Sequence, residues 1–345
     1  MQRVKKYLQY SPELDSLTEK EQQLLTECLQ SVKEFVLNSK EINKTHFATR
    51  DAHSKTYAII EGELIMNEEL PDFAKNIFKE EKYSVLGRFS HANPKISYGK
   101  SIIPAYGFSI KINKSKNEII NLPLVNFPIF PVLEPSEFLV FFTLLNKYWV
   151  ARIKNIFDAI FVFSQLIIQS IKLSKNLFNF EFIKHSLSIF KHRKDFILSF
   201  SYHSIGVYRL GNYLIKLKVI PHDLFSKFKN VHSPKKGIEN YLKNKNISYN
   251  LFIQVSENIK QQPINDLTKE WKNAEWLKIG ELKFPPQNTQ NIHDEIWENI
   301  NFNPFENPDY ILPVGKIQQL RKETYKTSIL TRNNINITNN ETKNL

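Results

Sequence analysis

The chain of 345 residues carries a formal net charge of +12, and 41% of its residues are hydrophobic, so it can bury a sizeable core. Its 9 glycines are few beside 26 phenylalanines, and neither a GxGxxG nor a P-loop sequence occurs, which excludes a glycine-rich nucleotide-binding loop. The basic residues are scattered rather than clustered, and we therefore expect no nucleic-acid partner.

A single cysteine, Cys28, excludes disulfides within the chain and clusters of thiolate metal ligands. The first residues include several basic ones, but neither an apolar run nor a cleavage site follows them, so no secretory signal is predicted. Both features favour a reducing, cytoplasmic location.

The predicted elements begin with a helix over residues 12–38, where apolar side chains recur near a period of 3.6 residues. This helix dominates an expected N-terminal helical arm, residues 1–45. The period then changes to two, and Pro, Gly or charged turns bound each run, which is typical of antiparallel strands. The four runs cover residues 56–66, 82–90, 106–113 and 118–126.

A helical stretch from Pro135 to about Phe190 interrupts the strands, and residues from about 147 to 198 are interpreted as an insert. Eight strand runs in total predict a closed antiparallel β-barrel with flanking helices, an α+β fold. Closure removes the exposed edges that a chain so rich in Phe and Ile would otherwise present to solvent. The later runs cover residues 202–210, 213–221, 249–256 and 276–284.

The insert contains the most apolar window of the chain, residues 155–173. A helix that crosses a bilayer needs about 20 mostly apolar residues, and Asp158, Gln165 and Gln169 interrupt this shorter window. Two interpretations therefore remain open. The window forms either a helix that covers a barrel wall or a peripheral contact with a membrane or lipid.

The end of the chain is predicted to be helical over residues 292–300 and 315–330. The barrel and these helices are expected to form one domain, residues 46–330. Residues 331–345 are polar and low in complexity, so they are predicted to form a disordered tail.

The clearest chemical pattern is the pair Arg321 and Tyr325, spaced i and i+4 and therefore on one face of the last helix. A free phenol has a pKa of about 10, so a tyrosine ligates ferric iron at neutral pH only if its anion is stabilised. An arginine one turn earlier can donate charge-assisted hydrogen bonds to the phenolate oxygen. Because tyrosinate is one of the few protein ligands of haem iron, the pair is a candidate haem site.

Two other segments accompany this pair: TRDAHSKTY holds Arg50 and His53 before the first strand, and GRFS holds Arg88 and Ser90 at the end of the second. The order and spacing of the three segments resemble the haem catalases. They resemble more closely the short catalase-like haem proteins that lack the large catalase's C-terminal domain. The resemblance runs from about residue 46 to 142 and resumes from about residue 199 to 330.

This resemblance implies roles for residues on the distal side of a b-type haem. His53 would be the distal acid/base, and Ser90 the hydroxyl that orients it. The run LVNFPIF is similar to the family's distal asparagine motif, which implies that Asn126 lies beside His53 and that Phe130 lies near the haem edge.

Further roles follow for the remaining residues in the same way. Arg50 and Arg88 would bind the haem propionates, and Tyr325 would be the axial ligand of the haem iron with Arg321 as its partner. The sequence departs from the catalases at Thr56 and Ala58, where glycines are usual, and at Glu323, where they carry Phe; haem binding is expected to survive these changes better than fast catalase turnover. Ala52, where Val is usual, bears on the size of the distal pocket and on the preferred peroxide.

The function implied by the resemblance is that of a haem-dependent catalase or peroxidase that takes hydrogen peroxide or an organic hydroperoxide. One alternative is rearrangement of a lipid hydroperoxide, as in the related allene oxide synthases, for which the Phe-rich and Ile-rich insert would line an apolar channel. Another is haem binding without enzyme activity.

Overall fold

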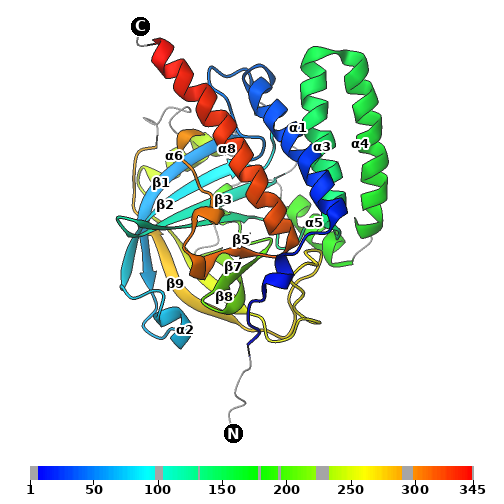
Figure 1. The fold of residues 1–345 in the computed structure, drawn as a ribbon. Helices are drawn as coiled ribbons and strands as arrows, with labels where there is room; N and C mark the ends of the chain where they lie inside the picture. Colours follow the sequence, from blue (N-terminus) through cyan, green and yellow to red (C-terminus); the bar gives the residue numbers. More distant parts are fainter. Residues whose placement is uncertain are drawn as a thin grey trace.

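The computed structural model describes residues 7–97, 104–130, 133–177, 180–192, 196–222, 233–289 and 298–343. Within these residues, eight antiparallel strands close a barrel in the order β1, β2, β3, β4, β5, β7, β8, β9 and back to β1 (Figure 1). The predicted eight-stranded barrel is confirmed. The strands are β1 (Lys55–Met66), β2 (Lys82–His91), β3 (Tyr106–Ser115), β4 (Glu118–Val125), β5 (Tyr202–His203), β7 (Tyr213–Pro221), β8 (Ile247–Val255) and β9 (Trp276–Phe284).

The predicted strand over residues 202–210 is divided in the structure. β5 ends at His203, and β6 (Val207–Leu210) pairs instead with the first part of β7. β10 (Pro313–Val314) then pairs with β6 at its outer side. The chain thus leaves the barrel wall after two residues, and β6 forms a hairpin with β7 that the alternating pattern alone does not distinguish from one continuous strand.

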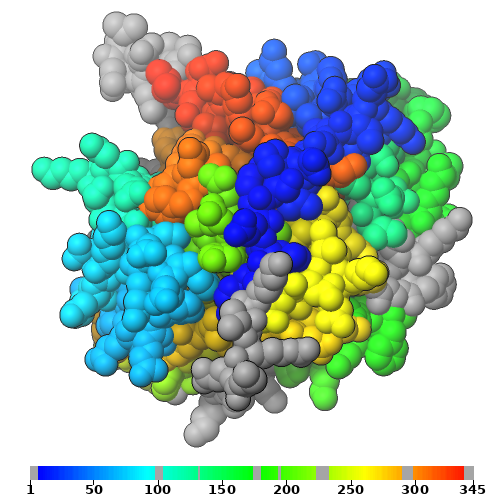
Figure 2. All heavy atoms as spheres, turned by 60° about the horizontal axis from the view of Figure 1, so that its bottom comes forward, coloured from blue at the N-terminus to red at the C-terminus, as the bar shows by residue number. Residues whose placement is uncertain are grey.

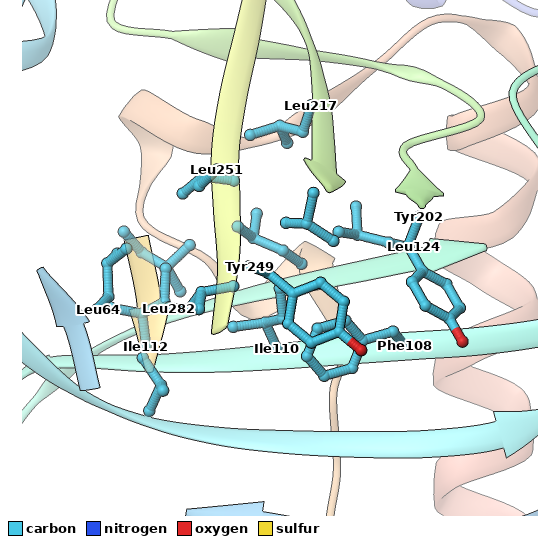
Figure 3. Packing of buried hydrophobic residues seen from close by; sticks show 14 of the residues in the cluster. Leu64, Phe108, Ile110, Ile112, Leu124, Tyr202, Leu217, Tyr249, Leu251 and Leu282 are labelled. Carbon is cyan, nitrogen blue, oxygen red and sulfur yellow. The ribbon is translucent and has the colours of Figure 1, made fainter. Parts of the chain in front are cut away.

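The inner face of the barrel is packed with apolar and aromatic side chains (Figure 3). Phe89 of β2 stacks on Phe108 of β3, with 4.3 Å between the ring centroids. Tyr202 and Tyr249 are fully buried, and their hydroxyls donate to backbone oxygens of the short helix η2 (Ile197–Ser199). The barrel interior is therefore a filled core, and a functional site has to lie at its ends or outside its wall.

Helix α1 (Glu19–Asn43) corresponds to the helix predicted over residues 12–38, but it begins later, at Glu19. The prediction of one continuous helix is wrong, because residues 12–15 form a separate turn, η1 (Pro12–Asp15). The main helix starts after Thr18, whose side chain and that of Glu21 form a capping box. The cap satisfies backbone N–H groups at that point, so the helix begins there.

Three helices follow β4: α3 (Pro135–Lys154), α4 (Ile156–Leu177) and α5 (Phe180–Lys191). The predicted helical stretch from Pro135 to about Phe190 is confirmed, and it is divided into three helices. α1 packs against α3 and against the last helix, α8 (Lys316–Lys343), so the N-terminal arm shares a core with the rest of the chain. Shorter helices are α2 (Asp72–Lys75), α6 (Pro234–Leu242), η3 (Pro304–Glu306) and η4 (Asp309–Ile311).

The prediction of a disordered tail from residue 331 is wrong, because α8 continues to Lys343. Asn336 is buried, and its side chain accepts from the backbone N–H of Ala48 at 2.8 Å and donates to the oxygen of the same residue. These bonds to a segment 288 residues away hold a polar sequence in a helix that its composition does not predict. Most of the predicted helix over residues 292–300 lies outside the described residues.

The N-terminal segment crosses the outside of the barrel before α1 begins. The backbone N–H of Leu8 donates to the oxygen of Ser256, and that of Tyr10 donates to the oxygen of Asn212. In Figure 2 this segment, in dark blue, lies between the lime-green and yellow parts of the surface. Asp15 also accepts from the backbone N–H of Gly315 at 2.6 Å, which fixes the start of α8.

Candidate functional site

One end of the barrel collects the residues predicted for the distal side. The first residues of β1 and β3 and the last residues of β2 and β4 lie at this end. The antiparallel register shows this, because Lys55 pairs with His91 and His91 pairs with Tyr106. Helix α8 contacts the segment that leads into β1, where Ser328 donates to Asp51 at 2.6 Å. The segment that holds His53 therefore lies between this end of the barrel and α8.

His53 has a constrained backbone and a ring fixed from one side. Its φ of +53° lies in the left-handed region, which non-glycine residues rarely adopt. Ser90, predicted to orient it, places Oγ 3.1 Å from Nδ1. A Cβ added to Gly107 would lie 2.6 Å from the same Nδ1, so only glycine leaves room for the ring here. With Nδ1 engaged, Nε2 is the nitrogen left for other chemistry.

The protonation state of His53 follows from its surroundings. Burial, and to a smaller extent the neighbouring positive charge of Arg88, lower the pKa of this imidazole to about 3. The ring is therefore neutral at pH 7 and can accept a proton. Its folded-state pKa lies below the ordinary value of 6.5, so it becomes charged only as the pH falls towards 3.

Arg88 is buried in the second strand, with 2% of its surface exposed. Its guanidinium donates to the backbone oxygen of His53 at 2.7 Å and to the hydroxyl of Thr56 at 3.0 Å. Among the described residues, no carboxylate lies within ion-pair distance of Arg88. Burial lowers the pKa of this guanidinium well below its ordinary value. A buried guanidinium with no carboxylate in direct contact among the described residues is costly, although the more distant charge of Glu298 stabilises it, and an anionic ligand would stabilise it further.

Two further arginines lie close to Arg88 and share one carboxylate. Arg50 Nε lies 2.8 Å from Glu298 Oε1, and Arg332 Nη1 of α8 lies 3.6 Å from the same oxygen. Both Glu298 and Arg332 are almost fully buried. Asp51 is buried nearby, and burial raises its pKa, although Ser328 donates to it. We call Arg50, Arg88 and Arg332 the arginine cluster.

The arginine cluster carries more charge than its carboxylates can neutralise. Among the described residues, these three guanidinium groups face two carboxylates, Glu298 and Asp51, so one positive charge is left over within this part of the chain. In addition, the buried Nε of Arg332 has no hydrogen-bond partner within the part of the chain that the structure describes. The region is therefore able to hold an anion with more than one acceptor oxygen.

On α8, the predicted pair Arg321 and Tyr325 are in contact. Arg321 Nη2 lies 3.3 Å from the Tyr325 hydroxyl, and Nη1 of the same guanidinium donates to Gln318 Oε1 at 2.8 Å. The phenol ring also packs edge-on against Phe305, with 5.8 Å between centroids. Arg321 is thus held from both sides, so its position beside the phenol oxygen is defined.

Gln318 occupies space that a side chain at Gly206 would need. A Cβ added to Gly206 would lie 1.4 Å from Gln318 Nε2, and Gln318 is 1% exposed. The glycine therefore permits the glutamine that holds Arg321. This contact was not predicted from the sequence, because the two residues lie 112 positions apart and no local pattern links them.

Replacing Gly206 by alanine should displace Gln318 and destabilise the fold by about 1–3 kcal/mol, the usual cost of overpacking. The free energy of unfolding, measured by urea titration, would show the loss. The double variant Gly206→Ala with Gln318→Ser should recover most of it, because serine leaves room for the added methyl group. If Gly206→Ala were as stable as the parent, the proposed packing of the Gln318 side chain against Gly206 would be wrong.

Asn126 and Phe130 take up contacts that the sequence did not predict. Asn126 follows β4, and its amide is bound to backbone at both ends: Oδ1 accepts from Tyr106 N–H at 2.8 Å, and Nδ2 donates to the oxygen of Pro104 at 2.7 Å. The ring of Phe130 packs against Phe138 of α3. The structure thus gives Asn126 a role in fixing the loop before β3, and it places Phe130 towards the helices.

A cavity of about 650 Å³ lies beside Asn126, between β7 and α5. Of the predicted site residues, Asn126 is the one on its wall. His185 and Glu270, which both line the cavity, are in contact, with 2.5 Å between Nε2 of the histidine and Oε1 of the glutamate. Burial lowers the pKa of Lys216 on the cavity wall to about 8, and the ammonium lies 5.2 Å from the centre of the Trp271 ring. His53 is not among the residues that line this cavity.

Arg332 and Glu298 belong to the site but were not predicted from the sequence. For Arg332 a signal existed: it follows Tyr325 by seven residues, two helical turns, and so lies on the same face of α8. Arg332 was not considered because residues 331–345 were predicted to be disordered. For Glu298 no local signal exists, because its partner Arg50 lies 248 residues away.

Comparison with known proteins supports the fold. No family model matches this chain, and no curated protein sequence matches it. Solved structures do match. A fungal catalase covers 86% of this chain at 17% identity with a TM-score of 0.61, and catalase A from Saccharomyces cerevisiae covers 86% at 15% with a TM-score of 0.59. A bacterial catalase covers 96% at 13% identity with a TM-score of 0.59.

This likeness is one of fold. The chain matches 61–64% of the length of these three catalases, and it is therefore similar to less than two thirds of each. The catalase-like fold that the resemblance implied is confirmed at this level.

Proposed function

We propose that this chain binds a b-type haem through the phenolate of Tyr325 and acts on a peroxide next to His53. The observation that carries the proposal is the positive charge left over in the arginine cluster, beside a tyrosine that already accepts from an arginine. The catalase-like fold supports a haem and a peroxide-related function for this arrangement.

The residues present fit a haem in three respects. Tyr325 offers an oxygen donor whose anion Arg321 would stabilise, and the porphyrin itself would bring the other ligands of the iron. Two propionate carboxylates would supply the negative charge that Arg88 lacks and an acceptor for the free Nε of Arg332. Arg50 is a weaker candidate for a propionate, because Glu298 already takes up its charge.

The bound haem would supply ferric iron as the place where the O–O bond of a peroxide is broken. His53, neutral because of its low pKa, would accept a proton from one peroxide oxygen and return it to the other. Ser90 would keep the ring oriented through Nδ1, which leaves Nε2 for this transfer. Proton transfer by a positioned side chain contributes roughly 10²- to 10⁴-fold to a rate.

Haem titration of an Arg88→Met variant tests the proposal. The parent should bind one haem per chain with a high-spin ferric spectrum, since tyrosinate is a weak-field ligand. Losing charge-assisted bonds, worth about 1.5–3 kcal/mol, should weaken haem binding in Arg88→Met roughly 10- to 100-fold. Arg50→Met should lose less, because Glu298 already pairs with Arg50.

The control is Arg152→Met, which removes the same charge from the exposed end of α3 and should bind haem as the parent does. A parent protein that takes up no haem would overturn the proposed function. Unchanged binding in Arg88→Met would instead show that the arginine cluster does not hold the propionates.

A further inference from the structure

The outer face of α4 is apolar and open to solvent. The helix stands at the edge of the molecule, where one side packs against α3 and the other faces away from the barrel (Figure 1). Ala159, Leu166 and Leu173 are the buried side. The exposed side chains are each 47–77% exposed: Phe157, Ile160, Phe161, Ile167, Ile168 and Ile171. We call these six residues the α4 stripe.

A second stripe continues the pattern on α5. Phe180, Ile183 and Leu187 recur at helical spacing and are 39–79% exposed. Exposed apolar side chains in this number, on two successive helices, indicate a binding surface. The other side of α5 lines the cavity beside Asn126, so the helix cannot turn its apolar side inward without opening that cavity.

The charges around the stripes are almost all positive. Arg152 and Lys154 stand at the turn into α4, Lys172 lies near its end, and Lys184 lies beside the α5 stripe, all exposed. Over residues 147–192 the acidic side chains are Asp158 and Glu181, and Glu181 already pairs with Lys272 at 2.8 Å. An apolar helix face with a basic rim is typical of helices that lie in the surface of an anionic bilayer.

We propose that the α4 and α5 stripes dock this protein on the surface of a bilayer that contains anionic lipids. Ile156–Leu173 is long and apolar enough to cross a membrane, yet α3 covers one side of the helix, so α4 lies on the bilayer with its stripe among the acyl chains. A second copy of this chain is a poorer partner, since its own basic rim would oppose this one, whereas anionic headgroups neutralise the rim.

Vesicle flotation of the full chain tests the docking. The protein should float with vesicles of phosphatidylcholine mixed with phosphatidylglycerol, and less with phosphatidylcholine alone or at raised salt. The double variant Phe157→Ser with Phe161→Ser should partition roughly 10- to 100-fold less, because each phenyl ring contributes through its buried area. Both side chains are exposed, so the variant should fold.

The matched control is Leu37→Ser with Leu330→Ser, which removes two exposed apolar side chains from α1 and α8 and should float as the parent does. Light scattering reports the oligomeric state of the same samples. A parent that does not float, or floats equally with neutral vesicles, overturns the proposal. So does a parent dimer that the stripe variant dissociates without any vesicle binding. None of these outcomes depends on haem.

Discussion

Tyr325→Phe should abolish haem binding or change the haem spectrum while the fold stays intact. Phenylalanine keeps the ring that packs against Phe305 but removes the oxygen that Arg321 contacts. Without the phenolate, no axial ligand remains on α8 at this position. Absorption spectra of the reconstituted variant would show the loss, and circular dichroism would confirm the fold.

The matched control is Tyr208→Phe. Tyr208 is a second buried phenol near Arg321 and Tyr325, and its hydroxyl has no hydrogen-bond partner among the described residues. Removing it should leave the haem spectrum unchanged. If Tyr208→Phe loses haem and Tyr325→Phe keeps it, the axial ligand has been assigned to the wrong tyrosine.

His53→Ala should keep the haem and slow peroxide cleavage by at least roughly 10²-fold, the lower end of what positioned proton transfer contributes. The variant removes the neutral imidazole and leaves Tyr325 and the arginine cluster in place. Rapid-mixing measurements of peroxide consumption by haem-loaded protein would give the rate. His203→Ala is the control, because burial also lowers the pKa of His203 to about 3, but this residue lines the cavity between β7 and α5, which His53 does not line.

The pH dependence separates this role from a structural one. Because the pKa of His53 is lowered to about 3, its base form persists, and the rate should stay flat between about pH 5 and pH 8. The unfolded chain protonates its histidine near 6.5 while the folded chain does not, so His53 reduces stability as the pH falls below that value. A His53→Ala protein that consumes peroxide as fast as the parent would leave haem binding alone as the function.

Local sequence patterns predicted most of the strands and helices and some of the contacts in the candidate site. The period-two runs set the barrel strands, because alternate side chains face a buried interior. Their limits agree with the structure to within a few residues, except for the run over residues 202–210, which is divided into β5 and β6. The Arg321–Tyr325 contact follows from helical spacing alone. Ser90 lies beside His53 because one ends β2 and the other precedes β1, and these strands pair in antiparallel register.

Only the tertiary structure decided where the charges meet. Glu298 neutralises Arg50 across 248 residues, and Gln318 enters the space at Gly206, and neither contact leaves a trace in the local sequence. The polar segment after residue 331 is helical because Asn336 and Arg332 find buried partners on Ala48 and Glu298. Composition measures the propensity of a segment in isolation, whereas partners supplied by distant segments decide whether a polar helix is stable.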